Sequence, residues 1–336
     1  MPSNPDSGLT SLSSWLTDFG SDDSGIGLKE LSISSPDAGE VILDFQFAPV
    51  NPADLNTIEG TYGIKPALPS PIGSEGIAKI LQVGSAVEGL HEGDMVLPIK
   101  SVPCWQQYAV ARAEACYLVH EPHSIEQASM LTVNPLTAWC LLSQIVKLEE
   151  GDWIIQNAAT SGVGRAVIAI AQSLGIKTMN LVRREESIQE IKALGADMVL
   201  LDSHETLKDL KAWSKEAAPR LGFNAVGGDS AVRVAQALAP GGTHVTFGAM
   251  GLKPVTASNG QLIFKDLRFQ GFWLTRWGGS AKRAQVQAAL DSILPLFANE
   301  QIQTPVSKVY PLSQMNDALQ AARSKERQGK ILLDLR

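Results

Sequence analysis

Ile155-Gln156-Asn157-Ala158-Ala159-Thr160-Ser161-Gly162-Val163-Gly164 joins a short apolar segment to an amphipathic one. The pattern predicts a strand over 153–157 and a helix over 163–174, which Gly175 ends. Small residues in such a turn let backbone N–H groups approach a phosphate, and the helix N-terminus adds partial positive charge. The glycine pattern is incomplete, because Ala159 and Ser161 stand where G-x-G has its first two glycines. The stretch therefore indicates a dinucleotide-binding turn, with an ordinary tight turn as the alternative.

The neighbouring sequence supports a nucleotide-binding fold. Strand and helix patterns alternate over 151–250, with strands predicted at 177–182 and 198–201 and a helix at 185–194. This alternation predicts a parallel, doubly wound sheet of the Rossmann type. Up to about residue 120, short strands separated by Gly-rich turns predict a compact β-rich unit. Residues 1–27 are rich in Ser, Gly and Asp, and we expect them to form an irregular arm or to fray.

Two adjacent arginines follow the second strand of the predicted sheet. Arg183 lies 22 residues after Ser161 (183 − 161), where an acidic residue usually meets the ribose of NAD(H). A guanidinium group matches phosphate oxygens bidentately, so an arginine at this place accommodates a 2′-phosphate. Arg183 and Arg184 therefore favour NADP(H) as the cofactor. A solvated charged pair that opens the next helix is the alternative interpretation.

Composition excludes several classes of protein. The 336 residues carry a net charge of −7, so the broad basic surface that binds nucleic acid or an anionic membrane is missing. No apolar run reaches the roughly 18 residues of a membrane-spanning helix. Three cysteines without a C-x-x-C pair suit a reducing compartment. With no basic residue before Lys29, we expect a cytoplasmic protein, although a mitochondrial presequence removed beforehand would leave no trace.

Two glycine motifs, Gly73-Ser74-Glu75-Gly76 and Gly93-Asp94-Met95-Val96, together with the turn at 155–164, resemble the medium-chain dehydrogenase/reductase superfamily. Many of its alcohol dehydrogenases have zinc-ligating Cys and His residues where this chain has Asn51 and Ser74. Asn and Ser are poor zinc ligands, and the five histidines are scattered. We therefore expect no metal site and no metal-assisted alcohol oxidation.

Within this superfamily the chain resembles the trans-2-enoyl-CoA (2-enoyl thioester) reductases of mitochondrial fatty acid synthesis, from about residue 40 to 336. The stretches that carry the resemblance are NPADLNTIEGTY (51–62), VNPLTAW (133–139), QNAATSGVG (156–164), NLVR (180–183) and LIFKDLRFQGFWLTRW (262–277). The resemblance implies a GroES-like β-rich catalytic domain, 1–133 and 271–336, and an NADP-binding Rossmann domain, 134–270. It also implies a homodimer through edge strands near 243–247 and 268–274.

The resemblance further assigns roles to individual residues. Tyr62 matches the family's catalytic proton donor, whereas the residues alone favour a plain aromatic side chain on the loop after Gly60. The positions implied to bind NADPH or to line its nicotinamide pocket are Asn134, Thr160, Ser161, Gly162, Val163, Gly164, Arg183, Arg184, Glu185, Phe247, Gly248, Ala249, Met250, Phe272, Trp273, Leu274 and Lys330. Glu185 departs from the family, whose members often have a second basic residue there.

The function implied is NADPH-dependent reduction of enoyl-CoA or enoyl-acyl carrier protein to the saturated thioester, within fatty acid synthesis. Hydride goes to the β-carbon and a proton from Tyr62 goes to the α-carbon. An NADPH:quinone or alkenal oxidoreductase of the same superfamily is the main alternative, because it shares the Asn-Pro-x-Asp start at 51–54. A cofactor-binding structural protein without turnover is a third hypothesis. Acyl chain length and the choice between CoA and carrier protein stay open at this point.

Overall fold

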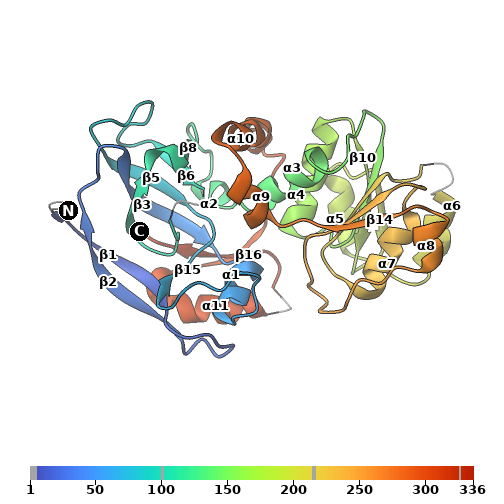
Figure 1. Ribbon diagram of the computed structural model, residues 1–336, viewed down its shortest axis with the longest axis horizontal. Helices are drawn as coiled ribbons and strands as arrows, with labels where there is room; N and C mark the ends of the chain where they lie inside the picture. The colour runs from blue at the N-terminus through green and yellow to red at the C-terminus, as the bar shows by residue number, and fades with distance from the viewer. Residues whose placement is uncertain (1–5, 100–101, 214–216, 325–326) are drawn as a thin grey trace. The chain divides into compact units, whose positions relative to one another are not determined.

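The computed structural model describes residues 6–99, 102–213, 217–324 and 327–336. The chain divides into two compact units. Unit 1 contains residues 1–133 and 304–336, and unit 2 contains residues 134–303 (Figure 1). Unit 1 is thus built from both ends of the chain, and unit 2 from one continuous segment.

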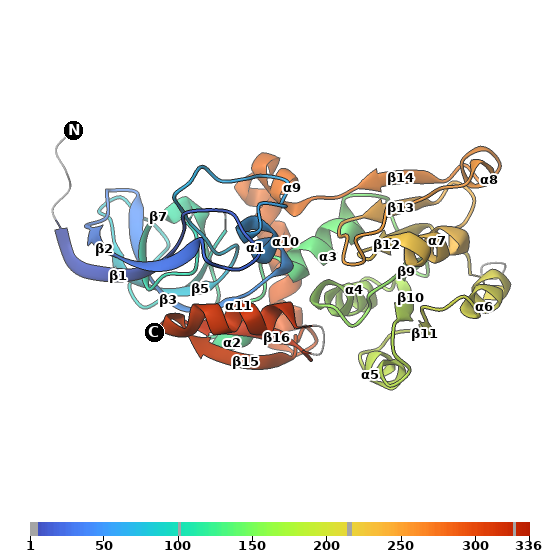
Figure 2. The ribbon, with the colours of Figure 1, turned by 90° about the horizontal axis from the view of Figure 1, so that it is seen from below.

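Unit 2 is organised around a parallel sheet of six strands, in the order β11-β10-β9-β12-β13-β14. Figure 2 shows this order, with β11 at one edge and β14 at the other. With β9 as the first strand, the order is 3-2-1-4-5-6, which is the Rossmann order expected from the alternating pattern. The strands are β9 (Trp153–Gln156), β10 (Lys177–Val182), β11 (Met198–Leu201), β12 (Leu221–Asn224), β13 (Thr243–Thr246) and β14 (Arg268–Gly271).

Helices cover both faces of this sheet. Ile168 of α4 and Ile191 of α5 pack with Val182 on one face. Leu210 of α6 and Val234 of α7 pack with the adjacent Leu181 on the other, since successive strand residues point to opposite faces. The helices are α3 (Asn134–Ser143), α4 (Gly162–Ser173), α5 (Ser187–Ala193), α6 (Thr206–Trp213), α7 (Gly228–Ala237), α8 (Asn259–Ile263), α9 (Leu274–Ser280) and α10 (Arg283–Ala298).

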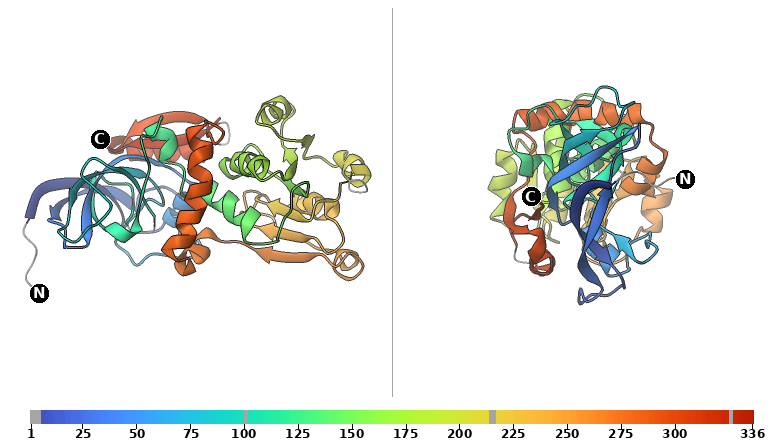
Figure 3. Two further views of the ribbon diagram at one scale, coloured as in Figure 1. Left: turned by 90° about the horizontal axis from the view of Figure 1, so that it is seen from above. Right: turned by 90° about the vertical axis from the view of Figure 1, so that its left-hand side faces the viewer.

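The division between the units falls after Gln303, whereas the sequence led us to expect it after Gln270. The reason is the packing of the two last helices of unit 2. Helix α10, the long orange helix in the left view of Figure 3, packs on α3 and α4, and α9 packs on α3. The ring centroids of Trp139 in α3 and Trp277 in α9 lie 6.3 Å apart. Residues 271–303 are therefore part of the compact unit that contains the parallel sheet.

Unit 1 contains a mixed sheet of seven strands with the order β15-β16-β3-β5-β6-β8, in which β7 also pairs with β3. Its core surrounds the fully buried Trp105 and Phe45. The strands are β3 (Glu40–Pro49), β5 (Ile77–Val83), β6 (Met95–Pro98), β7 (Tyr108–Arg112), β8 (Cys116–Leu118), β15 (Val306–Pro311) and β16 (Lys330–Asp334). The helices are α1 (Pro52–Ile58), α2 (Ile125–Ala128) and α11 (Met315–Arg323).

The expectation of an irregular or frayed segment over 1–27 is wrong for residues 6–16, which form a strand, while residues 1–5 lie outside the described residues. Strands β1 (Asp6–Leu16) and β2 (Ile26–Ser34) pair with each other, and β1 also pairs with β4 (Ser70–Pro71). Serines of β1 are buried rather than solvated, because the segment packs on 104–108. Ser11 Oγ donates to the carbonyl of Tyr108 at 2.8 Å, and Ser14 N donates to that of Trp105 at 2.9 Å. Small hydroxyl side chains with backbone partners therefore take positions where periodicity predicts apolar residues.

Candidate active site

The turn between β9 and α4 has the geometry of a phosphate-binding turn. Ala158 takes a left-handed backbone with φ of 50°. Ser161 caps α4, and its hydroxyl accepts a hydrogen bond from Gly164 N at 3.1 Å. A β-carbon on Gly164 would lie 2.6 Å from the carbonyl oxygen of Ala159, so only glycine fits there. Thr160 is exposed and Ser161 half-buried, while Val163 points into the core. The turn therefore packs closely against the backbone of Ala159 on its buried side. On its other side it is open to solvent at the N-terminus of α4.

Asn134, the first residue of α3, lies against this turn. Its side-chain nitrogen is buried and has no hydrogen-bond partner among the residues that the structure describes. A β-carbon built on Gly162 would stand 2.7 Å from that nitrogen. A buried donor without an acceptor is costly, unless a ligand accepts from it. This unpaired amide beside a glycine-lined turn is what a bound dinucleotide would need, so the residues present fit the cofactor.

The three charged residues predicted to select the cofactor follow the last residue of β10. Arg183, Arg184 and Glu185 are all exposed. Arg184 Nε lies 3.4 Å from Glu186, in a pair that is largely solvated. Arg183 and Arg184 are therefore available to an anionic group at the carboxyl end of β10.

Two further predicted segments follow β13 and β14. Phe247 and Gly248 are half-buried, whereas Ala249 and Met250 are exposed. Phe272, Trp273 and Leu274 are half-buried, and Leu274 begins α9. All strands of the sheet are parallel, so these segments, the turn after β9 and the arginines after β10 lie at one edge, the carboxyl edge. The structure therefore brings the predicted residues of unit 2 to the edge where doubly wound sheets bind ligands.

A polar network below this edge is a feature that the sequence analysis did not identify. Asn157 Nδ2 donates to Asn224 Oδ1 and to Ser230 Oγ, both at 2.8 Å, and its oxygen accepts from Ala225 N at 2.8 Å. Asn224 Oδ1 also accepts from Gly227 N at 2.9 Å. These amides join the turn after β9 to the turn after β12. Asn157 directly follows the strand β9, and Asn224 is the last residue of β12. A polar residue at the carboxyl end of a buried strand is the sequence signal from which the network could have been found.

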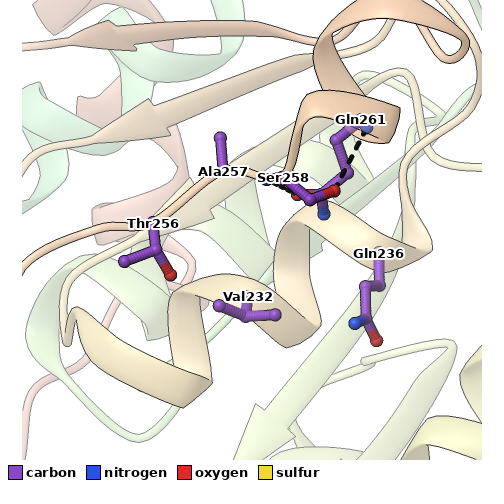
Figure 4. Close-up of a pocket in the computed structure, with 6 residues that line it drawn as sticks. All are labelled: Val232, Gln236, Thr256, Ala257, Ser258 and Gln261. Atoms are coloured by element: carbon purple, nitrogen blue, oxygen red, sulfur yellow. Dashed lines mark hydrogen bonds between the residues drawn. The ribbon is translucent and has the colours of Figure 1, made fainter.

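An open cavity of about 360 Å³ lies in another part of unit 2 (Figure 4). It is lined by residues of α7 and of the segment leading into α8: Val232, Gln236, Thr256, Ala257, Ser258 and Gln261. Ser258 and Gln261 bond to each other as the cap of α8. None of the predicted site residues lines this cavity, so we do not assign it to the site.

In unit 1, Tyr62 lies just after α1 and is half-buried. The backbone N–H groups of Thr61 and Tyr62 both donate to the carbonyl of Asn56, at 2.9 and 3.0 Å. Gly60 makes the bend after the helix with φ of 70°, where a β-carbon would meet the ring of Phe19 at 3.0 Å. The backbone of Tyr62 is therefore bound to the body of α1.

Lys330, predicted to reach the cofactor, begins β16 and is only 7% exposed. Its ammonium donates to the side-chain oxygen of Asn51. Asn51 in turn contacts the buried carboxylates of Asp54 and Glu75. Burial raises the pKa of Asp54 to about 6 and lowers that of Lys330 to about 8. Four polar residues thus form one buried cluster in unit 1, which includes Asn51, one of the two positions where the sequence differs from the zinc-ligand pattern.

Neither a membrane span nor a metal-ligand cluster occurs in the described ranges. No helix there is long and apolar enough to cross a bilayer. No group of three or more His, Cys, Asp or Glu side chains is placed to hold a metal ion within those same ranges.

Comparison with known proteins gives matches over nearly the whole chain. Residues 37–130 match the alcohol dehydrogenase GroES-like domain, and residues 162–294 match the zinc-binding dehydrogenase family. The mitochondrial enoyl-[acyl-carrier-protein] reductase of Rattus norvegicus is 39% identical over 303 residues, which cover 88% of this chain and 81% of that protein. The protein of the same name from Homo sapiens is also 39% identical over 303 residues, with the same coverage.

Among solved structures, the Etr1p/NADP/crotonyl-CoA complex matches with a TM-score of 0.87 and 28% identity, covering 97% of this chain and 100% of that one. A mutant form of enoyl thioester reductase from Candida tropicalis also matches with a TM-score of 0.87, at 27% identity and the same coverage. A putative NADPH:quinone reductase from Bacillus thuringiensis has a TM-score of 0.89 at 24% identity, over 97% of this chain and 99% of that one. This last likeness is one of fold.

Proposed function

Because this chain belongs to the enoyl thioester reductase family of the medium-chain dehydrogenase/reductase superfamily, we propose that it reduces trans-2-enoyl thioesters to saturated acyl thioesters with NADPH. The observation that carries this proposal is the unpaired amide of Asn134 beside the glycine turn at the carboxyl edge of the sheet. The substrates are enoyl-CoA or enoyl-acyl carrier protein, and the pathway is fatty acid synthesis.

The residues of unit 2 bind the cofactor. Backbone N–H groups of the turn over Thr160–Val163 would hold the pyrophosphate, Gly164 would let the backbone pack closely behind it, and Asn134 would donate to the nicotinamide half. Arg183 and Arg184 hold the 2′-phosphate, with Glu185 beside them. The segments Phe247–Met250 and Phe272–Leu274 enclose the nicotinamide and keep water from it. When bound, NADPH supplies the hydride that the β-carbon of the substrate receives.

Tyr62 supplies the second hydrogen atom. As the β-carbon gains a hydride, the electron pair of the double bond moves to the α-carbon and the thioester oxygen. The phenolic O–H of Tyr62 then gives its proton to the α-carbon, and water returns a proton to the phenolate. A neutral phenol suits this step because the proton goes to a carbon that becomes basic only as the reaction proceeds.

The experiment that tests this function compares substrates. Reduction of crotonyl-CoA or hexenoyl-CoA is expected to exceed that of a benzoquinone in kcat/KM by at least about 100-fold, with NADPH preferred over NADH. A preference for the quinone or for a free alkenal would favour the alternative oxidoreductase. Binding of NADPH without oxidation by any substrate would favour the structural protein.

The homodimer is also part of this proposal. β14 is an edge strand, and no further strand pairs with it in the described part of the chain. The segment that leads into β14 presents Ile263, the last residue of α8, 69% exposed, and Phe264 after it, 87% exposed. An exposed apolar group next to an unpaired strand edge fits pairing with a second copy across a twofold axis.

The compartment expected from the sequence, cytoplasmic, stays a prediction. The relatives at 39% identity are named as mitochondrial proteins. Imaging of the chain with a C-terminal fluorescent tag in its own cells distinguishes the two locations.

A further inference from the structure

The buried cluster of unit 1 contains three ionisable side chains around one amide. Lys330, Asp54 and Glu75 are 7%, 4% and 1% exposed, and Asn51 between them is 1% exposed. Charges removed from water are expensive, and apolar residues of the same volume often stabilise a fold as well. Stability alone is therefore a weak reason for such a cluster. The contacts of Asn51 show what else it does.

Every polar group of Asn51 near the cluster has a partner that fixes its orientation. The ammonium of Lys330 can only donate hydrogen bonds, so the oxygen of the Asn51 amide, and not its nitrogen, must face it. The amide nitrogen then faces Glu75, to whose Oε1 it donates at 2.8 Å. The backbone N–H of Asn51 donates to Asp54 Oδ2 at 2.8 Å. Lys330 thus sets the direction of the Asn51 amide, and the two carboxylates hold the rest of the residue.

Asn51 is also the N-cap of α1, the helix to which the backbone of Tyr62 is bound. Asp54, in the first turn of α1, accepts both from Asn51 N and, at 3.0 Å, from Ser74 N. The start of α1 is therefore fixed by the cluster. Because Tyr62 N donates to Asn56 O of the same short helix, a shift of the helix start would shift the tyrosine as well.

Glu75 extends the cluster to the end of unit 1. Its Oε2 accepts from the backbone N–H groups of Thr132 and Val133, at 3.1 and 2.8 Å. Val133 is the residue before Asn134 in the chain. One carboxylate thus orients Asn51 and at the same time holds the backbone that leads into the predicted cofactor site.

We propose that Lys330 is a positioning residue of the reductase: through Asn51 it holds the start of α1, and thereby places the hydroxyl of Tyr62 for proton transfer. This inference rests on the proposed function, in which Tyr62 is the proton donor. It differs from the role implied by the family resemblance, in which the ammonium of Lys330 contacts the cofactor.

The test begins with Lys330→Met, which keeps an unbranched apolar side chain as far as Cε and removes the ammonium. Lys308→Met is the matched control, because Lys308 lies on the neighbouring strand β15 and is exposed. We expect Lys330→Met to lower kcat for crotonyl-CoA at least tenfold while the Kd for NADPH changes less than threefold. The control is expected to change neither. A tenfold rise in the Kd for NADPH with an unchanged kcat at saturation would overturn the proposal and make Lys330 a cofactor ligand.

A double-mutant cycle tests whether Lys330 acts through Tyr62. In a Tyr62→Phe background, Lys330→Met is expected to lower kcat less than twofold, because the group it positions has been removed. An equal loss in both backgrounds would contradict the proposal. If Lys330→Met does not fold because Glu75 loses its counter-charge, the pair Lys330→Met with Glu75→Gln restores the charge balance and is measured instead.

Amide hydrogen exchange gives a readout that does not depend on activity. Exchange in peptides over 52–62 is expected to be at least tenfold faster in Lys330→Met than in Lys308→Met, and unchanged exchange overturns the proposal. Full activity of Tyr62→Phe would instead remove Tyr62 as the donor and leave Lys330 as an anchor of α1. No turnover of any enoyl thioester by the unmodified protein would contradict the proposed function itself.

Discussion

The side-chain nitrogen of Asn134 lies 2.7 Å from the position that a β-carbon would take on Gly162. The glycine therefore leaves just enough space for the amide, which has no other partner in the ranges that the structure covers. This relationship places the first residue of α3 against the first residue of α4, at the turn that we propose binds the cofactor.

Gly162→Ala is expected to narrow this cradle. The added methyl group would displace the Asn134 amide and fill part of the space beside the turn. We therefore expect the Kd for NADPH to rise about tenfold, or ~1.4 kcal/mol. Binding is measured by the fluorescence of NADPH during titration. Gly279→Ala is the control, because a β-carbon there meets nothing within 4 Å. An unchanged Kd for Gly162→Ala would mean that the turn does not contact the cofactor.

Arg183→Ala is expected to weaken NADPH binding about tenfold and NADH binding less than twofold, because hydrogen bonds to a charged phosphate contribute about 1.5–3 kcal/mol. Glu185→Arg is expected to act in the opposite direction, since it removes a like charge beside the 2′-phosphate. Isothermal titration calorimetry with both cofactors gives, for each variant, the ratio of the Kd for NADH to the Kd for NADPH. The exposed Arg112→Ala in unit 1 is the control. Equal losses for NADH and NADPH would contradict the assignment of Arg183.

Tyr62→Phe is expected to lower kcat with crotonyl-CoA at least about 100-fold, within the range that a positioned general acid contributes. The Kd for NADPH is expected to remain the same, because the substitution removes only the phenolic hydroxyl and leaves every residue proposed to bind the cofactor unchanged. Stopped-flow measurement of NADPH oxidation checks the rate. Tyr108→Phe, on β7, serves as the control, and a Tyr62→Phe protein of full activity would exclude this tyrosine as the donor.

His244 gives the protein a defined sensitivity to acid. The side chain is fully buried in β13 with its ring 4.9 Å from that of Phe269, and burial lowers its pKa from 6.5 to about 4. Between these values the unfolded chain binds more protons, so the free energy of unfolding falls as the pH drops from 6.5 to 4. This histidine contributes up to roughly 3 kcal/mol of that loss.

His244→Phe is therefore expected to unfold at a temperature that depends less on pH over this range. Asp54 acts in the opposite direction between pH 3.8 and 6, because its pKa is raised, and it does so equally in both proteins. Calorimetry at several pH values measures the unfolding temperatures of the variant and of the parent protein, and their difference is followed as a function of pH. The exposed His204→Phe is the control, and parallel pH profiles for the parent and His244→Phe would refute the linkage.

Phe264→Glu is expected to convert the proposed homodimer into a monomer, because a carboxylate in an apolar interface loses its hydration. Light scattering after size-exclusion chromatography measures the mass. Leu174→Glu introduces the same charge at another exposed apolar position of unit 2 and is expected to leave the dimer intact. A monomeric parent protein would disprove the proposed homodimer at once.

The sequence predicted the elements whose signal is local. The alternating strands and helices around Ile155–Gly164 are found as predicted, because a buried parallel strand and an amphipathic helix each have a clear periodicity. Strand β1 was missed because its buried positions include the polar residues Ser11, Ser13 and Ser14. The hydroxyls of Ser11 and Ser14 donate to the distant carbonyls of Tyr108 and Ile72. A search for periodic hydrophobic residues overlooks a strand whose buried positions are partly polar.

The candidate site divides in the same way. The turn and the arginines follow local motifs, and the structure places them at one sheet edge. The contact of Lys330 with Asn51 joins residues 279 positions apart, and its partner Glu75 lies in a third segment. Such a cluster depends on sheet pairing between distant strands, which a single sequence does not encode in any local pattern.

Unit 1 is formed by two segments far apart in the chain, 1–133 and 304–336, which β16 joins because it pairs with β3 and carries Lys330. During synthesis, the ribosome releases Asp54 and Glu75 long before the lysine that neutralises them. Unit 2, a continuous segment, is available to fold in that interval. A nascent chain stalled before residue 330 would therefore carry a complete unit 2 and a unit 1 that still lacks β16 and the ammonium of Lys330.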